Sequence, residues 1–151
     1  MKLAVLVGCG RKIGLLALPF LMVGTVTNIL KPAWFDVGGP PFPLLVVSLV
    51  VMIPGIIIWA WSVYLILTRI PQKELITNGP YALMKHPLYT GVALFVLPWL
   101  GFLCNSWLGL VIGGIVYIGC RIYAPEEEKV LSQIFGVVWH DYTTKVLIPW
   151  L

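Results

Sequence analysis

The stretch NGPYALMKHPLYTG, at residues 78–91, holds several of the side chains in this chain that could do chemistry. These side chains are Tyr81, Lys85, His86 and Tyr89, and an acidic pair, Glu127 and Glu128, follows further along. A histidine donates or accepts hydrogen bonds, while carboxylates and aromatic faces attract cations. The set therefore suits a ligand that has a positive centre, a zwitterionic end and a ring.

The same residues also have an interpretation without any function. Lysine, histidine and tyrosine are common at membrane interfaces, and acids in the first turn of a helix stabilise the helix dipole. The elements that position these side chains must therefore be considered next.

The rest of the chain is strongly hydrophobic. Of its 151 residues, 60% are hydrophobic and only 11% are charged, and the mean hydropathy is +0.96. A soluble domain would carry about a quarter charged residues. The apolar runs at 13–30, 42–67 and 88–122 are long enough to cross a membrane, and so small a soluble domain could not bury them. The chain is therefore expected to be an all-α integral membrane protein.

The third apolar run is too long for one helix and is expected to form two. Asn105 and Ser106 favour a turn, and a break there gives about four membrane-spanning helices. In this arrangement the N-terminus, residues 68–87 and the C-terminal tail share one side, which carries every Lys and Arg except Lys31. Such an excess marks the cytoplasmic side, so a multi-pass protein with a cytoplasm-facing site is predicted.

The basic net charge of +4 is explained by this topology and by contact with anionic lipid. No basic patch is interleaved with aromatic residues, so nucleic acid is not an expected partner. Cys9, Cys104 and Cys120 are scattered along the chain, so neither a metal site nor a disulfide framework is predicted.

The chain is expected to form a single membrane domain over residues 1–151. Residues 1–67 are expected to form two anchoring spans without functional residues, and residues 68–151 are expected to form the catalytic part. Within that part, helix breakers predict an interfacial loop that ends with Pro87 at the start of the next span.

A C-terminal amphipathic helix is predicted after the last span. Its start is expected at Pro125, a residue type that suits the first turn of a helix. Its apolar stripe is formed by Leu131, Ile134, Phe135, Val138 and Tyr142, which recur at helical spacing.

Taken in order, these motifs resemble the isoprenylcysteine carboxyl methyltransferase family. The matching residues are Gly79-Pro80-Tyr81, Lys85-His86-Pro87, Tyr89, Gly91, Glu127-Glu128, Leu131, Phe135-Gly136, Trp139 and Tyr142. The resemblance covers roughly residues 70–147, about half of the chain.

The resemblance implies a membrane methyltransferase that uses S-adenosylmethionine and a lipophilic acceptor such as an isoprenylcysteine carboxylate. The residues that it implies in cofactor binding are Lys73, Glu74, Leu75, Ile76, Tyr81, His86, Pro87, Leu88, Tyr89, Glu127 and Glu128, and those in catalysis are Glu127 and Arg121. The expected reaction is in-line methyl transfer, to which the enzyme contributes positioning and exclusion of water.

Three residues depart from the family pattern. Lys85 stands where the family usually has Arg, which replaces a bidentate contact with a point charge. Arg121 lies slightly further from the acidic pair than the family arginine. Trp139 stands where Tyr is more frequent and is similar to the pattern of sterol reductases. An NADPH-dependent sterol or isoprenoid reductase and a non-enzymatic small membrane subunit therefore stay open as alternatives, as do the acceptor and the oligomeric state.

Overall fold

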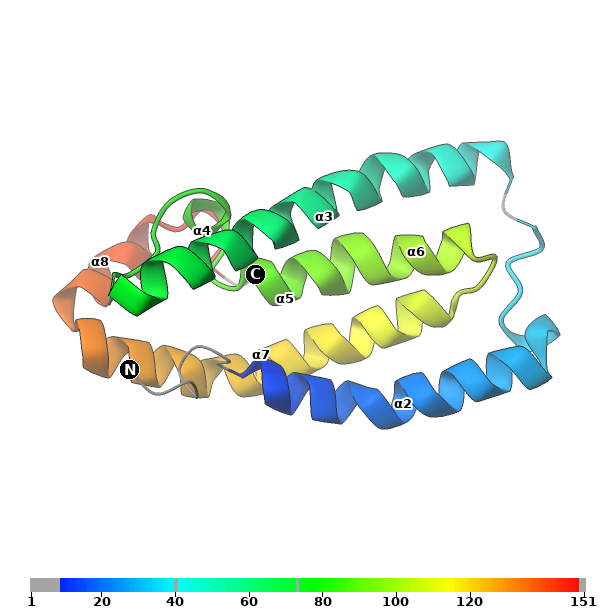
Figure 1. Ribbon diagram of the computed structural model, residues 1–151, viewed down its shortest axis with the longest axis horizontal. Helices are drawn as coiled ribbons and strands as arrows, with labels where there is room; N and C mark the ends of the chain where they lie inside the picture. Colours follow the sequence, from blue (N-terminus) through cyan, green and yellow to red (C-terminus); the bar gives the residue numbers. More distant parts are fainter. Residues whose placement is uncertain (1–8, 40, 73, 150–151) are drawn as a thin grey trace.

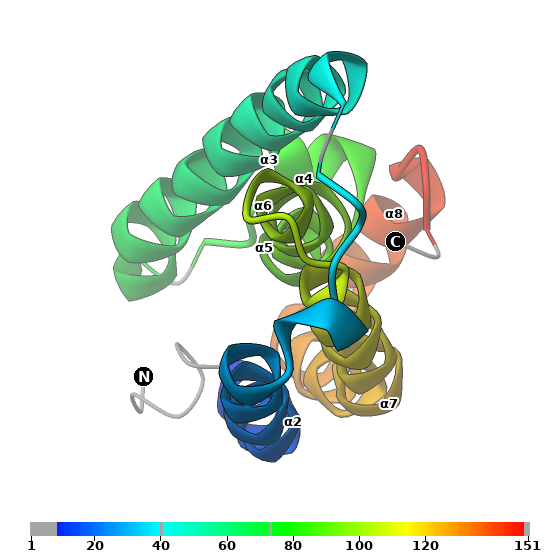
Figure 2. The same cartoon turned by 90° about the vertical axis from the view of Figure 1, so that its right-hand side faces the viewer.

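Four long helical segments run side by side along the molecule in a computed structural model that describes residues 9–39, 41–72 and 74–149 (Figure 1). The segments are α2 (Gly10–Leu30), α3 (Phe42–Arg69), the composite segment 87–103 and α7 (Leu108–Phe135). The composite segment consists of α5 (Pro87–Thr90), the π-helical η3 (Gly91–Val96) and α6 (Leu97–Leu103). It lies between α3 and α7, and α2 packs on the outer side of α7 (Figure 2).

These segments are helical and apolar enough to account for a membrane protein. The helices α2 and α7, and α3 with the short η2 turn (Ile70–Gln72) that continues it, are long and apolar enough to cross a bilayer, and residues 87–103 form a shorter apolar segment. Their outward faces expose large hydrophobic side chains, such as Ile29 at 72% and Phe42 at 78%, which lipid would cover. The predicted all-α membrane fold is confirmed.

The break predicted near Asn105 is present between α6 and α7. Asn105 has a positive φ of 52°, a conformation that Asn tolerates better than most residues. Its side-chain amide donates to Asp36 Oδ1 at 2.7 Å, and its Oδ1 accepts from the Gly39 N–H at 3.0 Å. Trp107 adds a backbone bond from its N–H to the Phe35 carbonyl at 3.0 Å. The hairpin turn is thus fastened to the loop that joins α2 and α3.

A close approach between α3 and the composite segment requires a glycine. A Cβ atom on Gly55 would lie 2.5 Å from Phe95 Cβ, well inside normal contact. Gly55 follows Pro54 in the middle of α3, which continues as one helix through both residues. Gly55 therefore serves helix packing in this fold.

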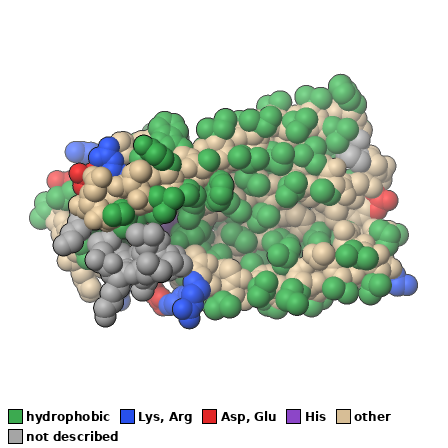
Figure 3. Space-filling view, in the orientation of Figure 1, with side chains coloured by type: hydrophobic (Ala, Val, Ile, Leu, Met, Phe, Trp, Pro, Cys, Tyr) green, Lys and Arg blue, Asp and Glu red, His purple; other side chains and the backbone are tan. Residues whose placement is uncertain are grey.

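The 3₁₀ turn η1 (Pro32–Trp34) lies at the hairpin end of the bundle. The other short elements, η2, α4 (Pro80–Leu83) and α8 (Val137–Lys145), lie at the opposite end. Figure 3 shows most of the visible charged side chains gathered at this end, with few at the opposite one. Pro87 begins the composite segment, as predicted.

The prediction of a single amphipathic helix that starts at Pro125 is wrong. Pro125 lies inside α7, which continues without interruption from the span to Phe135. Pro is tolerated within membrane helices because neighbouring groups satisfy the freed backbone atoms. Gly136, with a positive φ of 52°, ends α7, and the remainder of the expected helix forms the separate α8.

Candidate functional site

A cavity of about 590 Å³ lies at the end of the bundle that carries α4 and α8. Its volume is within the range of about 300–1,000 Å³ that is usual for small-molecule sites. The predicted site residues that line it are Glu74, Leu75, Ile76, Tyr81, His86, Leu88, Tyr89 and Glu127. Residues that are far apart in sequence thus meet around one space, as the expected four-helix topology requires.

The remaining predicted residues are placed differently. Pro87 is fully buried and does not line this cavity. Arg121 and Glu128 line a second cavity of about 220 Å³ next to it. Lys73 lies outside the described residues.

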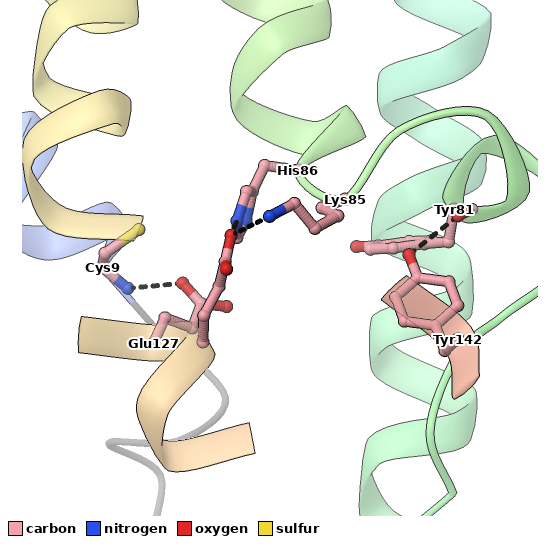
Figure 4. A network of polar contacts seen from close by, with 7 residues as sticks. Cys9, Tyr81, Lys85, His86, Glu127 and Tyr142 are labelled. Atoms are coloured by element: carbon pink, nitrogen blue, oxygen red, sulfur yellow. Dashed lines mark hydrogen bonds and ion pairs between the residues drawn. The ribbon is translucent and has the colours of Figure 1, made fainter. Parts of the chain in front are cut away.

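Glu128 links the acidic pair on α7 to the Lys85-His86 motif, because it contacts both Lys85 and His86. Its Oε1 lies 2.7 Å from Lys85 Nζ and 3.1 Å from His86 Nε2 (Figure 4). The contact with an ionised carboxylate requires a proton on His86 Nε2. Lys85 and His86 line both cavities. This charged cluster therefore stands in the wall between them.

Glu127 points in another direction, because adjacent residues on a helix are rotated by about 100°. Its Oε2 accepts a hydrogen bond from the Cys9 N–H at 3.0 Å (Figure 4). Cys9 is the residue before α2, so Glu127 satisfies one of the backbone donors that a helix N-terminus leaves unpaired. Lys12 and Glu126 form an ion pair beside it. The acidic segment of α7 thus holds the N-terminal end of α2 against the cavity.

The opposite wall is held by α8 and the tail that follows it. The Tyr142 hydroxyl donates to the Tyr81 carbonyl oxygen at 2.8 Å (Figure 4). The N–H groups of Leu147 and Ile148 donate to the carbonyls of Ala82 at 3.4 Å and Leu83 at 2.8 Å. The C-terminal part is therefore fastened onto the Gly-Pro-Tyr turn that carries Tyr81.

Burial determines the protonation state of the two tyrosines in this wall. It raises the pKa of Tyr81 and of Tyr142 above the ordinary value for a phenol, with smaller contributions from the Glu127 charge at Tyr81 and the Glu128 charge at Tyr142. Both hydroxyls are therefore protonated at neutral pH. Tyr142 can act as the donor that its contact with Tyr81 requires.

The cavity is amphipathic. Its polar lining includes the Glu127 carboxylate, the His86 ring and the phenols of Tyr81 and Tyr89. Its apolar lining includes residues from α3 and α7, namely Val63, Ile66, Leu67, Val130, Ile134 and Phe135. A polar, positively charged ligand and an apolar one can therefore be accommodated in a single space.

Several lining residues were not anticipated from the sequence. They are Cys9, Gly10 and Lys12 at the start of α2, Val63, Ile66 and Leu67 at the end of α3, and Ile70 in η2. Residues 1–67 were expected only to anchor the protein, yet the ends of both helices form part of the wall. The close approach at Gly10, where a Cβ would lie 3.1 Å from the Tyr89 ring, exists only in the folded chain, so the sequence carried no signal for these residues.

Four further lining residues belong to the sequence motifs but not to the predicted site, namely Leu131, Phe135, Trp139 and Tyr142. Trp139 is buried, lines the cavity and lies 5.5 Å from the Tyr142 ring, measured between ring centroids.

Among residues 9–39, 41–72 and 74–149, no group of His, Cys, Asp and Glu is arranged to hold a metal ion.

Comparison with known proteins places the sequence among methyltransferases. The phospholipid methyltransferase family matches residues 44–137. A probable protein-S-isoprenylcysteine O-methyltransferase of Oryza sativa subsp. indica is 33% identical over 75 residues, which are 50% of this chain and 39% of that protein. Protein-S-isoprenylcysteine O-methyltransferase A of Arabidopsis thaliana is 33% identical over 72 residues, which are 48% of this chain and 36% of that protein.

The mouse protein-S-isoprenylcysteine O-methyltransferase is 35% identical over 72 residues, which are 48% of this chain and 25% of that protein. The matched regions are thus less than half of the length of these relatives. No solved structure matches the chain significantly. The resemblance inferred from the His-Pro and Glu-Glu motifs is confirmed by these relatives.

Proposed function

Because this chain belongs to the phospholipid methyltransferase family, we propose that it is a membrane methyltransferase that uses S-adenosylmethionine and a lipophilic acceptor. The observation that carries the proposal is the amphipathic cavity at the site end of the bundle. Its polar part suits a sulfonium compound with a zwitterionic end and a ring, and its apolar part suits a lipid-like chain.

The cofactor fits the groups that are present. The Glu127 carboxylate and the faces of Tyr81 and Tyr89 attract positive charge. Leu75 and Ile76 provide apolar contacts beside them, and Ile76 is itself buried. When bound, S-adenosylmethionine supplies an activated methyl group on a positively charged sulfur.

The residues of the chain then position the reactants and exclude water from them. Tyr81, His86 and Glu127 hold the polar ligand on one side, while α8 and its tail exclude water on the other. Glu128 orients His86 through the 3.1 Å contact. A carboxylate acceptor needs no general base, whereas an amine or thiol acceptor does, and His86 is then the candidate because it lines the cavity.

The acceptor is proposed only as a class. The similar plant and mouse proteins are named for isoprenylcysteine and the family is named for phospholipids, and both kinds of acceptor carry long apolar chains. The apolar wall formed by the ends of α3 and α7 supports such an acceptor, because these helices are long enough to cross the bilayer in which it would lie.

Calorimetry of the detergent-solubilised protein tests the donor. We expect S-adenosylhomocysteine to bind and NADPH not to bind. Glu127→Gln removes the charge but keeps an oxygen for the Cys9 N–H, and we expect it to lower the affinity about tenfold or more, as loss of a charge-assisted contact does. Asp141→Asn is the matched control, because Asp141 is exposed on α8 and does not line the cavity.

Two results would contradict the proposal. Binding of NADPH without any response to S-adenosylhomocysteine would favour the reductase alternative, which was raised because Trp139 is similar to the pattern of sterol reductases. No binding of either compound by folded protein would favour a non-enzymatic membrane subunit.

The side of the membrane is a separate part of the proposal. Asn78 and Ser132 flank the site and are replaced one at a time by cysteine in a variant without native cysteines. If the site faces the cytoplasm, a membrane-impermeant thiol reagent labels neither position in intact cells and labels both after permeabilisation. Labelling of both in intact cells would place the site outside.

A further inference from the structure

The second cavity has a composition of its own. It has a volume of about 220 Å³ and lies between the start of the composite segment and α7. Most of its lining side chains are polar or basic, and the ones that matter here are Lys85, Thr90, Tyr117, Arg121 and Glu128. The apolar wall that distinguishes the first cavity is missing from it.

Thr90 contributes an unusual hydroxyl to this cavity. Its side chain is 1% exposed, and its Oγ1 has no hydrogen-bond partner among the residues that the structure describes. A buried hydroxyl without a partner costs about 1–3 kcal/mol, and native proteins seldom keep one. A partner from outside the described chain would remove this cost.

Other helical hydroxyls in the chain show what Thr90 lacks. Ser48 and Ser62 donate to the carbonyl four residues earlier, each at 2.7 Å, and Thr68 does so at 2.8 Å. The corresponding carbonyl for Thr90 is that of His86, which accepts the Thr90 N–H at 3.0 Å but not its hydroxyl. The Thr90 hydroxyl is therefore without a partner among the described residues, and Thr90 is one of the residues that line the cavity.

The charges around the cavity favour an anion. Lys85 and Arg121 are cationic, and the single carboxylate, Glu128, already faces Lys85 and His86. The hydroxyls of Thr90 and Tyr117 are donors as well. Several donors that converge on one small space suit a group with several acceptor oxygens, such as a phosphate.

The surface beside the cavity indicates where such a phosphate comes from. Arg121 is exposed on α7 at the end of its apolar stretch, and Ile118 and Ile122 beside it are 56% and 57% exposed. One turn further into the span, a Cβ on Gly114 would meet nothing within 4 Å. This side of α7 is open and apolar along the bilayer, so acyl chains can lie against it while the head group reaches Arg121.

We propose that the second cavity binds the phosphate of an anionic membrane phospholipid, with the acyl chains lying along the Gly114–Ile122 side of α7. Basic pockets beside membrane helices at the cytoplasmic interface are known to take anionic lipid head groups. The site is distinct from the methyl-transfer cavity, although Lys85 and His86 stand in the wall that both share.

The test is native mass spectrometry of the protein in mild detergent, titrated with phosphatidylglycerol. Diacylglycerol of the same chains supplies the apolar part alone, and inorganic phosphate supplies the anion alone. The variants are Arg121→Gln and Thr90→Val, and Lys129→Gln is the control because it removes an equal charge from the same helix without lining either cavity.

We expect phosphatidylglycerol to bind at least about tenfold more tightly than diacylglycerol, since charge-assisted hydrogen bonds are lost with the head group. Arg121→Gln should remove most of this preference, Thr90→Val should weaken it severalfold, and Lys129→Gln should leave it unchanged. In melting experiments without lipid, Thr90→Val should not lower the melting temperature, because the hydroxyl has no partner to lose. This last result shows that the variant is folded and that its weaker binding is not a folding defect.

Three outcomes would overturn the proposal. Equal affinities for phosphatidylglycerol and diacylglycerol would show that the head group is not recognised. Competition by millimolar inorganic phosphate, with no gain from acyl chains, would make this a site for free phosphate. Loss of methyl transfer in Arg121→Gln with unchanged lipid binding would favour the catalytic role predicted for Arg121. Failure of S-adenosylhomocysteine to bind would contradict the proposed methyl transfer but leave this lipid site untouched.

Discussion

Replacing Tyr142 with phenylalanine removes a single hydroxyl from the wall of the larger cavity. That hydroxyl donates to the Tyr81 carbonyl at 2.8 Å, and the ring, which lies against Trp139, is kept. In the described residues, the other hydrogen bonds between this tail and the 81–83 turn come from Leu147 and Ile148. The substitution therefore weakens one defined attachment and preserves the packing around it.

The expected size of the effect follows from burial. Tyr142 is buried, so the Tyr81 carbonyl loses its donor without free access to water, which costs about 1–3 kcal/mol. Because about 1.4 kcal/mol corresponds to a factor of ten, the population in which α8 is detached should rise roughly tenfold. We expect S-adenosylhomocysteine to bind more weakly, since α8 and its tail help to close the cavity.

Hydrogen exchange measured by mass spectrometry checks this expectation. Peptides covering residues 137–149 of Tyr142→Phe should exchange about tenfold faster than in the unmodified protein, while peptides from α3 should not change. Tyr64→Phe is the control, because Tyr64 is exposed on α3 and its hydroxyl has no hydrogen bond within the described chain. Unchanged exchange of residues 137–149 in Tyr142→Phe would refute the view that this hydroxyl fastens α8.

Three further predictions concern stability and are read from melting temperatures in detergent. Gly55→Ala should destabilise the protein by about 1–3 kcal/mol because its Cβ would lie 2.5 Å from Phe95 Cβ. The control Gly14→Ala, whose Cβ would meet nothing within 4 Å, should be neutral or stabilising. Equal melting temperatures for the two variants would show that α3 can shift to make room for the added methyl group. Asn105→Ala should cost about 1–2 kcal/mol of stability, because alanine disfavours the positive φ and the contacts with Asp36 and Gly39 are lost. Asn105→Gly should cost less, because glycine adopts a positive φ without strain. A larger loss of stability in Asn105→Gly than in Asn105→Ala would contradict the strained turn. Burial raises the pKa of Tyr142, so its stabilisation is fully present below the unfolded-state pKa of about 10 and is lost as pH rises above it. Tyr142→Phe should therefore be less sensitive to alkaline pH than the unmodified protein, and an identical pH dependence would argue against that cause.

The membrane fold could be predicted from the sequence because it depends on local and compositional signals. Apolar runs of sufficient length form helices in lipid whatever their neighbours, since the backbone has no other way to satisfy its hydrogen bonds there. Asn105 marked the hairpin turn, because its short polar side chain tolerates the conformation that the turn requires. The order of the His-Pro and Glu-Glu motifs was sufficient to identify the resemblance to a methyltransferase family, which the comparisons confirm.

The end of α7 could not be predicted in the same way. Pro125 favours a helix start in isolation, but here it lies inside α7, where the helix runs on past the span and ends at Gly136. Whether a proline starts a helix or is accommodated within it depends on what packs around it, and neighbouring sequence does not contain that information.

The roles of the two glutamates were decided only by the tertiary structure. Glu127 and Glu128 are adjacent and alike in sequence, yet Glu127 lines the larger cavity and accepts the Cys9 N–H, while Glu128 faces Lys85 and His86. A helix separates their directions by about 100°, and its rotation about its own axis is set by its packing on α2 and on the composite segment. The sequence by itself determined that an acidic pair would lie at the same end of the bundle as His86. Which carboxylate met which partner depended on helix rotation, a property of the packed bundle that no local pattern encodes.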